Sequence, residues 1–215
     1  MCTRDGDAAR GCACVLCGAH SAMGICAGCA ADLPRAAAAP GARTPRAIDA
    51  VVAPYRYAYP LDALVGAFKF HRDLAVGHAL ARLLVHGVST HLQGIDRLVP
   101  VPLARVRYLS RGFNQAAILA QALGAASGIP VATACVRRTR GGEQQSRLSR
   151  TARRRNLVDA FTLAHPLAGE HVAIVDDVVT TGATAAALAS VLRRGGAKRV
   201  SLVVLAVTDN RRIAP

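Results

Sequence analysis

The chain has 215 residues and a formal net charge of +14 at pH 7, and arginine supplies most of the positive charge. This length suits one α/β domain with a small appendage. The basic excess favours polyanionic ligands such as phosphates, pyrophosphate or nucleic acid, although it does not choose among them. The apolar runs are much shorter than the roughly twenty residues of a membrane span, and no charged-then-apolar leader opens the chain, so we expect a cytoplasmic protein.

Six of the seven cysteines lie within the first thirty residues, in a segment that we predict to form a lobe, residues 1–33. Four of them make two C-x-x-C pairs, which are Cys14 with Cys17 and Cys26 with Cys29. In a reducing compartment this spacing favours a tetrahedral, structural Zn²⁺ site with four thiolates over disulfides. Cys12 or His20 could replace one ligand, and redox-active or degenerate cysteines are the alternative.

Residues 34–47 are predicted to form a linker, because a run of alanines there ends in proline and glycine. Apolar periodicity then predicts two strands and two helices. The strands cover Ala50–Ala53 and Tyr55–Tyr59, and the helices cover Leu61–Phe70 and Leu74–His86. Lys69 closes the first helix, either as a charge that interacts favourably with the helix dipole or as a residue near a ligand, and the sequence leaves both open.

A buried strand at Leu98–Leu103 ends in prolines, and a basic loop follows it. The loop contains Arg105, Arg107 and Arg111. The segment Gly112–Gln115 then opens a helix that is predicted to run through Leu123. Because the positive loop follows the carboxyl end of a strand, pyrophosphate is its natural occupant.

A further strand is predicted at Val131–Val136. Beyond it, Gly141-Gly142 lies among eight arginines that extend from Arg137 to Arg155. A solvated run of charge explains most of these arginines without any ligand.

A continuously apolar, β-branched run at Val172–Val175 is typical of a parallel strand that is buried on both faces. Asp176 and Asp177 follow at its carboxyl end, the edge where ligands bind in open α/β sheets. The elements beyond are a helix with Leu188, Val191 and Leu192 at helical spacing, a stop at Gly195-Gly196 and a last strand at Val200–Val207.

A turn rich in hydroxyls connects the acid pair to this helix. Thr180 and Thr181 offer donors, Gly182 permits a backbone conformation that a side chain forbids, and the first amides of the helix lack partners within it. Such a turn suits an anion. Two adjacent carboxylates suit vicinal sugar hydroxyls, or water around Mg²⁺, so the two features together predict a phosphorylated sugar. A capped strand end with a threonine-rich turn is the alternative.

From Ile174 to Thr184 the chain closely resembles the loop with which type I phosphoribosyltransferases bind 5-phosphoribosyl 1-pyrophosphate (PRPP). The pattern VPVPLxxxRxxxRGFNQ, from Val99 to Gln115, resembles the ComF-like competence family, a branch of that superfamily. The similarity continues in a QxxL motif at 145–148, an RxxN motif at 153–156 and Ala160-Phe161. Together with the cysteine pairs, it covers nearly the whole chain.

The resemblance implies an α/β protein with the type I phosphoribosyltransferase fold, an open and mostly parallel sheet flanked by helices over residues 48–215, with the small zinc-binding lobe before it. It implies PRPP as ligand, together with Mg²⁺ held by pyrophosphate and ribose oxygens. In this superfamily a mobile loop closes over PRPP at the place of the arginine-rich segment. Here the chain departs from the family, because Gly141-Gly142-Glu143 stands where a threonine usually precedes the glutamine.

The same resemblance assigns the site residues. Asp176 and Asp177 orient the ribose and the metal, and Arg111 stabilises the departing pyrophosphate. The implied substrate-binding residues are Thr180, Thr181, Gly182, Ala183 and Thr184 around the 5-phosphate, Val178 and Val179 before them, and Arg105, Gln115 and Gln145 elsewhere.

Three functions fit this site. The first is a phosphoribosyltransferase that releases pyrophosphate and has a nitrogen acceptor that the sequence does not disclose. The second is a non-enzymatic accessory protein of competence and DNA uptake, which contacts single-stranded DNA or the competence machinery, although four Tyr, four Phe and no Trp offer few stacking platforms. The third is a PRPP-sensing domain. The sequence does not indicate the oligomeric state either.

Overall fold

The computed structural model describes residues 12–36, 47–138 and 160–208. Its centre is a parallel sheet in the order β3-β9-β8-β5, and β4 also pairs with β9. The strands are β3 (Ala50–Val52), β4 (Tyr55–Arg56), β5 (Arg97–Pro100), β8 (His171–Val179) and β9 (Arg199–Val207). The expected open, mostly parallel sheet is thus confirmed.

The two long strands β8 and β9 form the middle of the sheet because they are apolar on both faces. Valine, leucine and isoleucine side chains that alternate along a strand enter the two opposite layers of core. Ile174 and Leu202 belong to one buried cluster, whereas Val175 and Val203 belong to the other.

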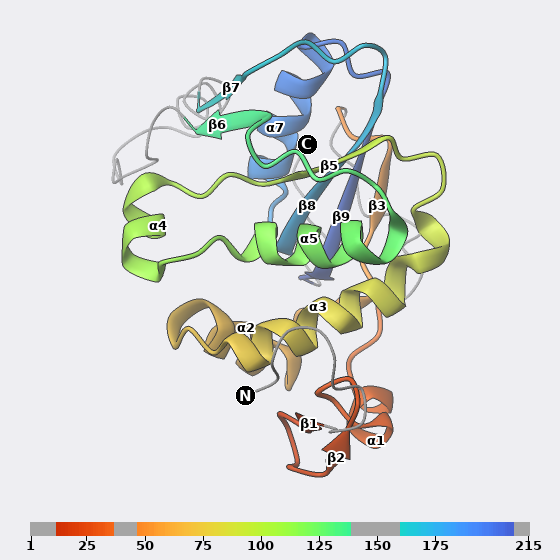
Figure 1. Cartoon of the computed structure of the whole chain (residues 1–215), viewed down its shortest axis with the longest axis vertical. Helices are drawn as coiled ribbons and strands as arrows, with labels where there is room; N and C mark the ends of the chain where they lie inside the picture. Colours follow the sequence, from red (N-terminus) through yellow and green to blue (C-terminus); the bar gives the residue numbers. More distant parts are fainter. Residues whose placement is uncertain (1–11, 37–46, 139–159, 209–215) are drawn as a thin grey trace.

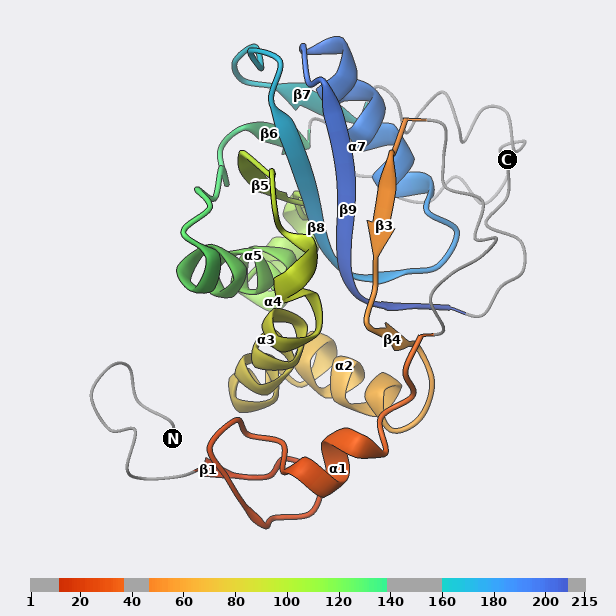
Figure 2. The ribbon, with the colours of Figure 1, turned by 90° about the vertical axis from the view of Figure 1, so that its right-hand side faces the viewer.

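Helices cover both faces of the sheet (Figures 1 and 2). One face packs against α7 (Ala183–Arg194) and the other against α5 (Gln115–Ser127) and α3 (Leu74–Val88), with α2 (Leu61–Phe70) packed on α3. A short 3-10 helix, Ser89–His91, follows α3, and an antiparallel pair of β6 (Val136–Arg138) and β7 (Phe161–Leu163) lies beside α7. The predicted helix at Leu61–Phe70 is confirmed at both ends.

Several local predictions are wrong. The basic loop after β5 is a helix, α4 (Arg105–Arg111), because nothing breaks the chain between Ala104 and Gly112. Gly112 ends it with a φ of 82° and donates its amide to the carbonyl of Tyr108. The strand expected at Val131–Val136 is also misplaced: Val131 makes only an isolated bridge to Leu98, and the strand starts at Val136. The second strand expected before α2 ends at Arg56 rather than at Tyr59.

The N-terminal cysteine lobe consists of β1 (Cys12–Ala13), β2 (His20–Ser21) and α1 (Ala27–Ala31). It lies against α3, where a Cβ on Gly24 would come within 3.0 Å of the Cβ of Ala79. Arg82 also donates a hydrogen bond to the carbonyl of Ala22 at 3.1 Å. The residue boundaries of the lobe and of the linker stay predictions. Among the described residues, no helix combines the length and apolar character that a membrane crossing requires.

Candidate functional site

The parallel pairing of β5 with β8 brings two strand-to-helix connections to the same edge of the sheet. Pro100 is in register with Val175, and the amide of Val101 donates to the carbonyl of Val175 at 2.9 Å. The connection from β5 leads into α4 and α5, and the connection from β8 leads into α7. Both carboxyl ends therefore face the same space, as in the ligand sites of open α/β sheets.

The acid pair lies inside the last part of β8 rather than after it, because pairing with β9 extends the strand to Val179. Asp177 is buried, and one of its oxygens, Oδ1, accepts a hydrogen bond from the amide of Val178 at 2.6 Å. The same oxygen lies 2.8 Å from Nζ of Lys69, at the end of α2. The ion pair connects the end of β8 to α2, although the two elements are far apart in the sequence.

Asp176 has a different electrostatic environment. Burial raises the pKa of its carboxyl from 3.8 to about 7, and the negative charge of Asp177 acts in the same direction. The amide of Asp177 donates to Asp176 at 2.9 Å, and this bond, Lys69 and Arg138 all oppose the rise in pKa. Burial and the neighbouring carboxylate therefore make Asp176 harder to ionise than an aspartate in solvent.

The threonine-glycine turn after β8 presents polar groups to solvent. Thr180 and Thr181 are exposed, and Gly182 has a φ of 72° at the N-cap of α7. This left-handed conformation explains the glycine. No side chain caps the helix, and the amide of Ala183 makes only a long contact, 3.4 Å, with Oγ1 of Thr181. The first amides of α7, including that of half-buried Thr184, suit an anionic group.

The second connection places an arginine and a glutamine at the start of α5. Arg111 donates to Oε1 of Gln115 at 3.2 Å. Gln115 is 2% exposed, and its Nε2 has no hydrogen-bond partner in the described structure. Asn114 fixes the loop, since its side chain caps α5 and donates to the carbonyl of Val101 at 3.0 Å. A buried donor without a partner is costly, and a ligand oxygen would satisfy it.

Arg138 at the end of β6 belongs to the same region, although sequence reasoning grouped it with a solvated charge run. It is half-buried, its Nε lacks a partner among the described residues, and its guanidinium lies 5.4 Å from the ring centroid of Phe161. Burial lowers the pKa of Arg138, Arg107 lowers it further, and Asp176 opposes both. A half-buried cation near the acid pair is a further candidate for contact with an anionic ligand. No local sequence signal separates it from its neighbouring arginines.

Two predicted site residues cannot be placed fully. Arg105 starts α4, but its side chain lies outside the described part of the structure. Gln145 lies in the segment 139–159, outside the described residues. Val178 is half-buried and Val179 is buried between the acid pair and the turn, where they serve as strand residues.

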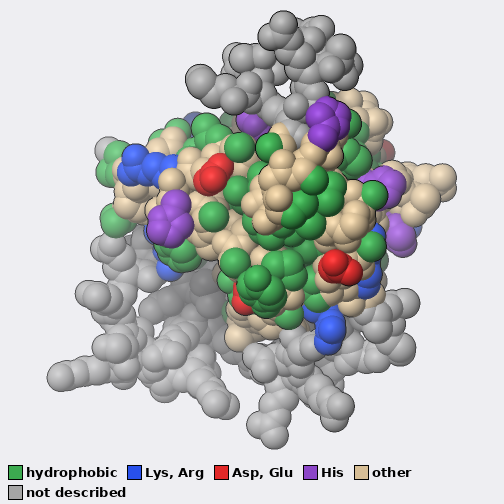
Figure 3. Space-filling view, turned by 90° about the horizontal axis from the view of Figure 1, so that it is seen from below, with side chains coloured by type: hydrophobic (Ala, Val, Ile, Leu, Met, Phe, Trp, Pro, Cys, Tyr) green, Lys and Arg blue, Asp and Glu red, His purple; other side chains and the backbone are tan. Residues whose placement is uncertain are grey.

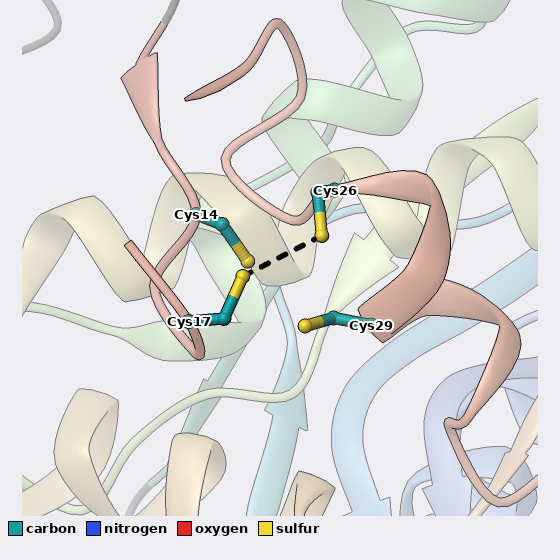
Figure 4. A group of neighbouring side chains, drawn as sticks. All are labelled: Cys14, Cys17, Cys26 and Cys29. Carbon is teal, nitrogen blue, oxygen red and sulfur yellow. Dashed lines mark hydrogen bonds between the residues drawn. The ribbon is translucent and has the colours of Figure 1, made fainter. Parts of the chain in front are cut away.

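The four cysteines of the two C-x-x-C pairs converge in the N-terminal lobe (Figure 4). Their Sγ atoms all lie within 4.8 Å of one another, and those of Cys17 and Cys26 are 3.6 Å apart. Ligands on a tetrahedral Zn²⁺ with Zn–S bonds of about 2.3 Å are separated by about 3.8 Å. The group can therefore hold a zinc ion. Exposed His20 is not part of the group, and the side chain of Cys12 lies outside the described residues.

Comparison with known proteins shows the family of this chain. The family model for the phosphoribosyl transferase domain matches residues 108–214, which include the second half of α4, the acid pair and the threonine-glycine turn. The chain is also 44% identical over 157 residues to the DNA utilization protein YhgH of Salmonella typhimurium, a match that covers 71% of this chain and 69% of the relative. It is 37% identical to competence protein F of Haemophilus influenzae over 70% of this chain and 69% of that protein. The chain belongs to the ComF-like competence family of the type I phosphoribosyltransferase superfamily.

Among solved structures, the purine phosphoribosyltransferase from Pyrococcus horikoshii is 21% identical, with a TM-score of 0.38, over 63% of this chain and 78% of that one.

The pKa of Asp176 gives a prediction about stability that does not depend on any ligand. Between about pH 4 and pH 7 the folded protein keeps a proton that the unfolded chain has released, so the free energy of unfolding falls as pH rises through this window. The Asp176→Asn variant should lack this loss and be more stable than the unchanged protein at pH 8, by about 1–3 kcal/mol.

Urea unfolding at pH 5, 6, 7 and 8 measures the difference, which should shrink toward pH 5. Asp32→Asn, which alters an exposed carboxylate, is the control. Parallel pH profiles for the Asp176→Asn variant and the unchanged protein would contradict the assigned pKa.

Proposed function

We propose that the chain binds PRPP with Mg²⁺ across the two connections and transfers the phosphoribosyl group to a nitrogen acceptor. The observation that carries this proposal is the acid pair followed by an uncapped threonine-glycine turn at the end of a central parallel strand. Membership of the family supports it.

The residues after β8 bind the sugar phosphate in this proposal. The hydroxyls of Thr180 and Thr181 and the amides of Gly182, Ala183 and Thr184 surround the 5-phosphate, and the dipole of α7 stabilises its charge. Asp176 and Asp177 accept hydrogen bonds from the ribose hydroxyls and from water around the metal. Val178 and Val179 set the distance between the acid pair and the turn that binds the phosphate.

The residues after β5 and Arg138 bind the pyrophosphate. Nε2 of Gln115 and Nε of Arg138 are buried donors without partners in the described structure, and pyrophosphate oxygens would satisfy both. Arg111 supplies positive charge next to Gln115, and Arg105 and Gln145 are further contacts that the family resemblance suggests.

The reaction breaks the bond between ribose C1 and the pyrophosphate oxygen and forms a bond from C1 to nitrogen, while the proton of the nucleophile passes to solvent. Mg²⁺, when bound, neutralises charge on the leaving pyrophosphate. The protein orients the ribose and stabilises the developing negative charge with fixed donors. In this proposal the acceptor contacts a hood formed by the cysteine lobe and residues 48–92, which include α2 and α3.

We also propose that the four-cysteine group holds a structural Zn²⁺. Hydrogen bonds with Cys17 and Cys26 raise the pKa of Cys29 to about 12. A divalent cation bound by the group would favour the thiolate form of Cys29.

A second candidate function, contact with single-stranded DNA, is favoured by the exposed surface of α4. Tyr108 is 51% exposed and Phe70, at the end of α2, is 71% exposed. The guanidinium of Arg111 lies 5.5 Å from the ring centroid of Phe70, and exposed Arg107 is on the same helix as Tyr108. Aromatic platforms beside cations suit unpaired bases and their phosphates. The face of the molecule seen from below in Figure 3, in contrast, has mostly apolar side chains in its middle and few Lys or Arg side chains among its described residues.

The enzymatic proposal predicts that Asp176→Asn and Asp177→Asn each weaken the binding of PRPP in Mg²⁺ buffer at pH 8, above the pKa of Asp176, at least tenfold, because each loses a carboxylate acceptor. Titration calorimetry measures the affinity, with Asp32→Asn as the control. Unchanged affinity in both variants would remove the ligand assignment.

Pyrophosphate release from PRPP, measured against a panel of bases and amines, then decides between transfer and sensing. Binding without release by any member of the panel would favour a PRPP-sensing domain.

The zinc proposal predicts about one Zn²⁺ per chain in the purified protein, measured by mass spectrometry of the metal. Cys14→Ser should lower the metal content and the free energy of unfolding, because the site links β1 to α1. A folded protein without zinc would refute the site.

The DNA proposal predicts that an oligonucleotide of thymidines binds more weakly as salt rises. Fluorescence anisotropy should show a loss of about fivefold to a hundredfold for Tyr108→Ala, which removes a stacking platform. Tyr59→Ala is the matched control, because Tyr59 is 81% exposed but precedes the opposite end of α2. Equal losses in both variants, or no binding at low salt, would count against this surface.

A further inference from the structure

The last turn of α2 contacts both connections at the sheet edge. Three consecutive residues, Phe68, Lys69 and Phe70, do this with different partners. Phe68 stacks on Phe113 with ring centroids 5.2 Å apart, and Phe70 lies under the guanidinium of Arg111. Both partners belong to the connection after β5. Lys69, between them, reaches the other connection through Asp177 at the end of β8.

The ion pair of Lys69 with Asp177 is well shielded from water. The side chains are 20% and 10% exposed, so solvent screens the attraction less than on an open surface. A lysine that only interacted with the dipole of its own helix would need no carboxylate partner and would remain in solvent. The structure therefore favours the second of the two roles that the sequence left open for Lys69.

The geometry at Asp177 leaves one oxygen for a ligand. Oδ1 accepts from both Nζ of Lys69 and the amide of Val178. Oδ2 has no hydrogen-bond partner among the described residues. Because two donors hold Oδ1, the orientation of the carboxylate is fixed, and Oδ2 points in a set direction.

We propose that Lys69 is a positioning residue of the sugar-phosphate site: its ammonium neutralises Asp177 and holds Oδ1, so that Oδ2 can accept a hydrogen bond from a ribose hydroxyl. This inference rests on the proposed function and adds a residue that acts through Asp177 rather than on the ligand itself. It also gives a role to Phe68 and Phe70, which contact the connection after β5. These contacts fix the end of α2, from which the ammonium of Lys69 reaches Asp177.

A double-mutant cycle tests this role. Lys69→Met should weaken the binding of PRPP in Mg²⁺ buffer by about tenfold or more, and Lys69→Arg should restore much of the loss because it keeps the charge. Once Asp177→Asn is present, Lys69→Met should cost little more, since both changes remove the same interaction. The chain has two lysines. Lys198→Met is therefore the matched control, because exposed Lys198 immediately precedes β9, at the opposite edge of the sheet.

Each outcome decides a separate point. If the unchanged protein binds PRPP and Lys69→Met binds equally well, the positioning role is overturned while the proposed function stands. Additive losses in the cycle would also overturn it, because they would show that Lys69 acts independently of Asp177. If Lys69→Met lowers only the melting temperature, the ion pair is structural. No binding of PRPP by the unchanged protein would overturn the proposed function and this inference with it.

Discussion

Parallel pairing between the short strand β5 and the long strand β8 is the constraint on which the candidate site depends. The ladder covers only four residue pairs, from Arg97 with Val172 to Pro100 with Val175. Polar contacts fix its other end: Arg97 donates twice to Glu170, at 2.6 and 2.7 Å, and Nδ1 of His171 donates to the carbonyl of Gly94 at 2.8 Å. A slip of one residue would turn every side chain of β5 to the opposite face. The register therefore decides whether the two connections meet.

Charge at this edge is balanced by residues that come from different parts of the chain. The protein carries a net charge of +14, yet the end of its central strand is acidic. Lys69 from α2 and Arg138 from β6 are the cations that lower the pKa of Asp176. The positive charge that compensates the pair is thus local, and the overall excess of arginine does not describe the electrostatics of the site.

Local signals in the sequence predicted the parts of the fold that local physics controls. Leu61–Phe70 was predicted to its ends because its apolar spacing matches one buried helix face. The helix α4 was missed because its apolar side chains, including Leu109, are exposed and give no such pattern. The extent of β8 past Asp176 depends on pairing with β9, which comes later in the chain. The contact of Lys69 with Asp177 likewise joins distant segments, so no periodicity could indicate it. The roles of the site residues stay predictions, and Gln145 lies outside the described residues.

The close contact between the cysteine lobe and α3 limits how this protein can vary. Gly24 has a φ of 78°, and a side chain there would meet both the Cβ and the Cα of Ala79. Neither Gly24 nor Ala79 has room for a larger side chain while the backbone of the lobe contacts α3. The same helix α3 packs against α2, which carries Lys69 in its last turn, so a larger side chain at this remote contact would push on the helix pair that supports the ion pair with Asp177. The spacing between lobe and helix is therefore fixed by two of the smallest residues in the chain.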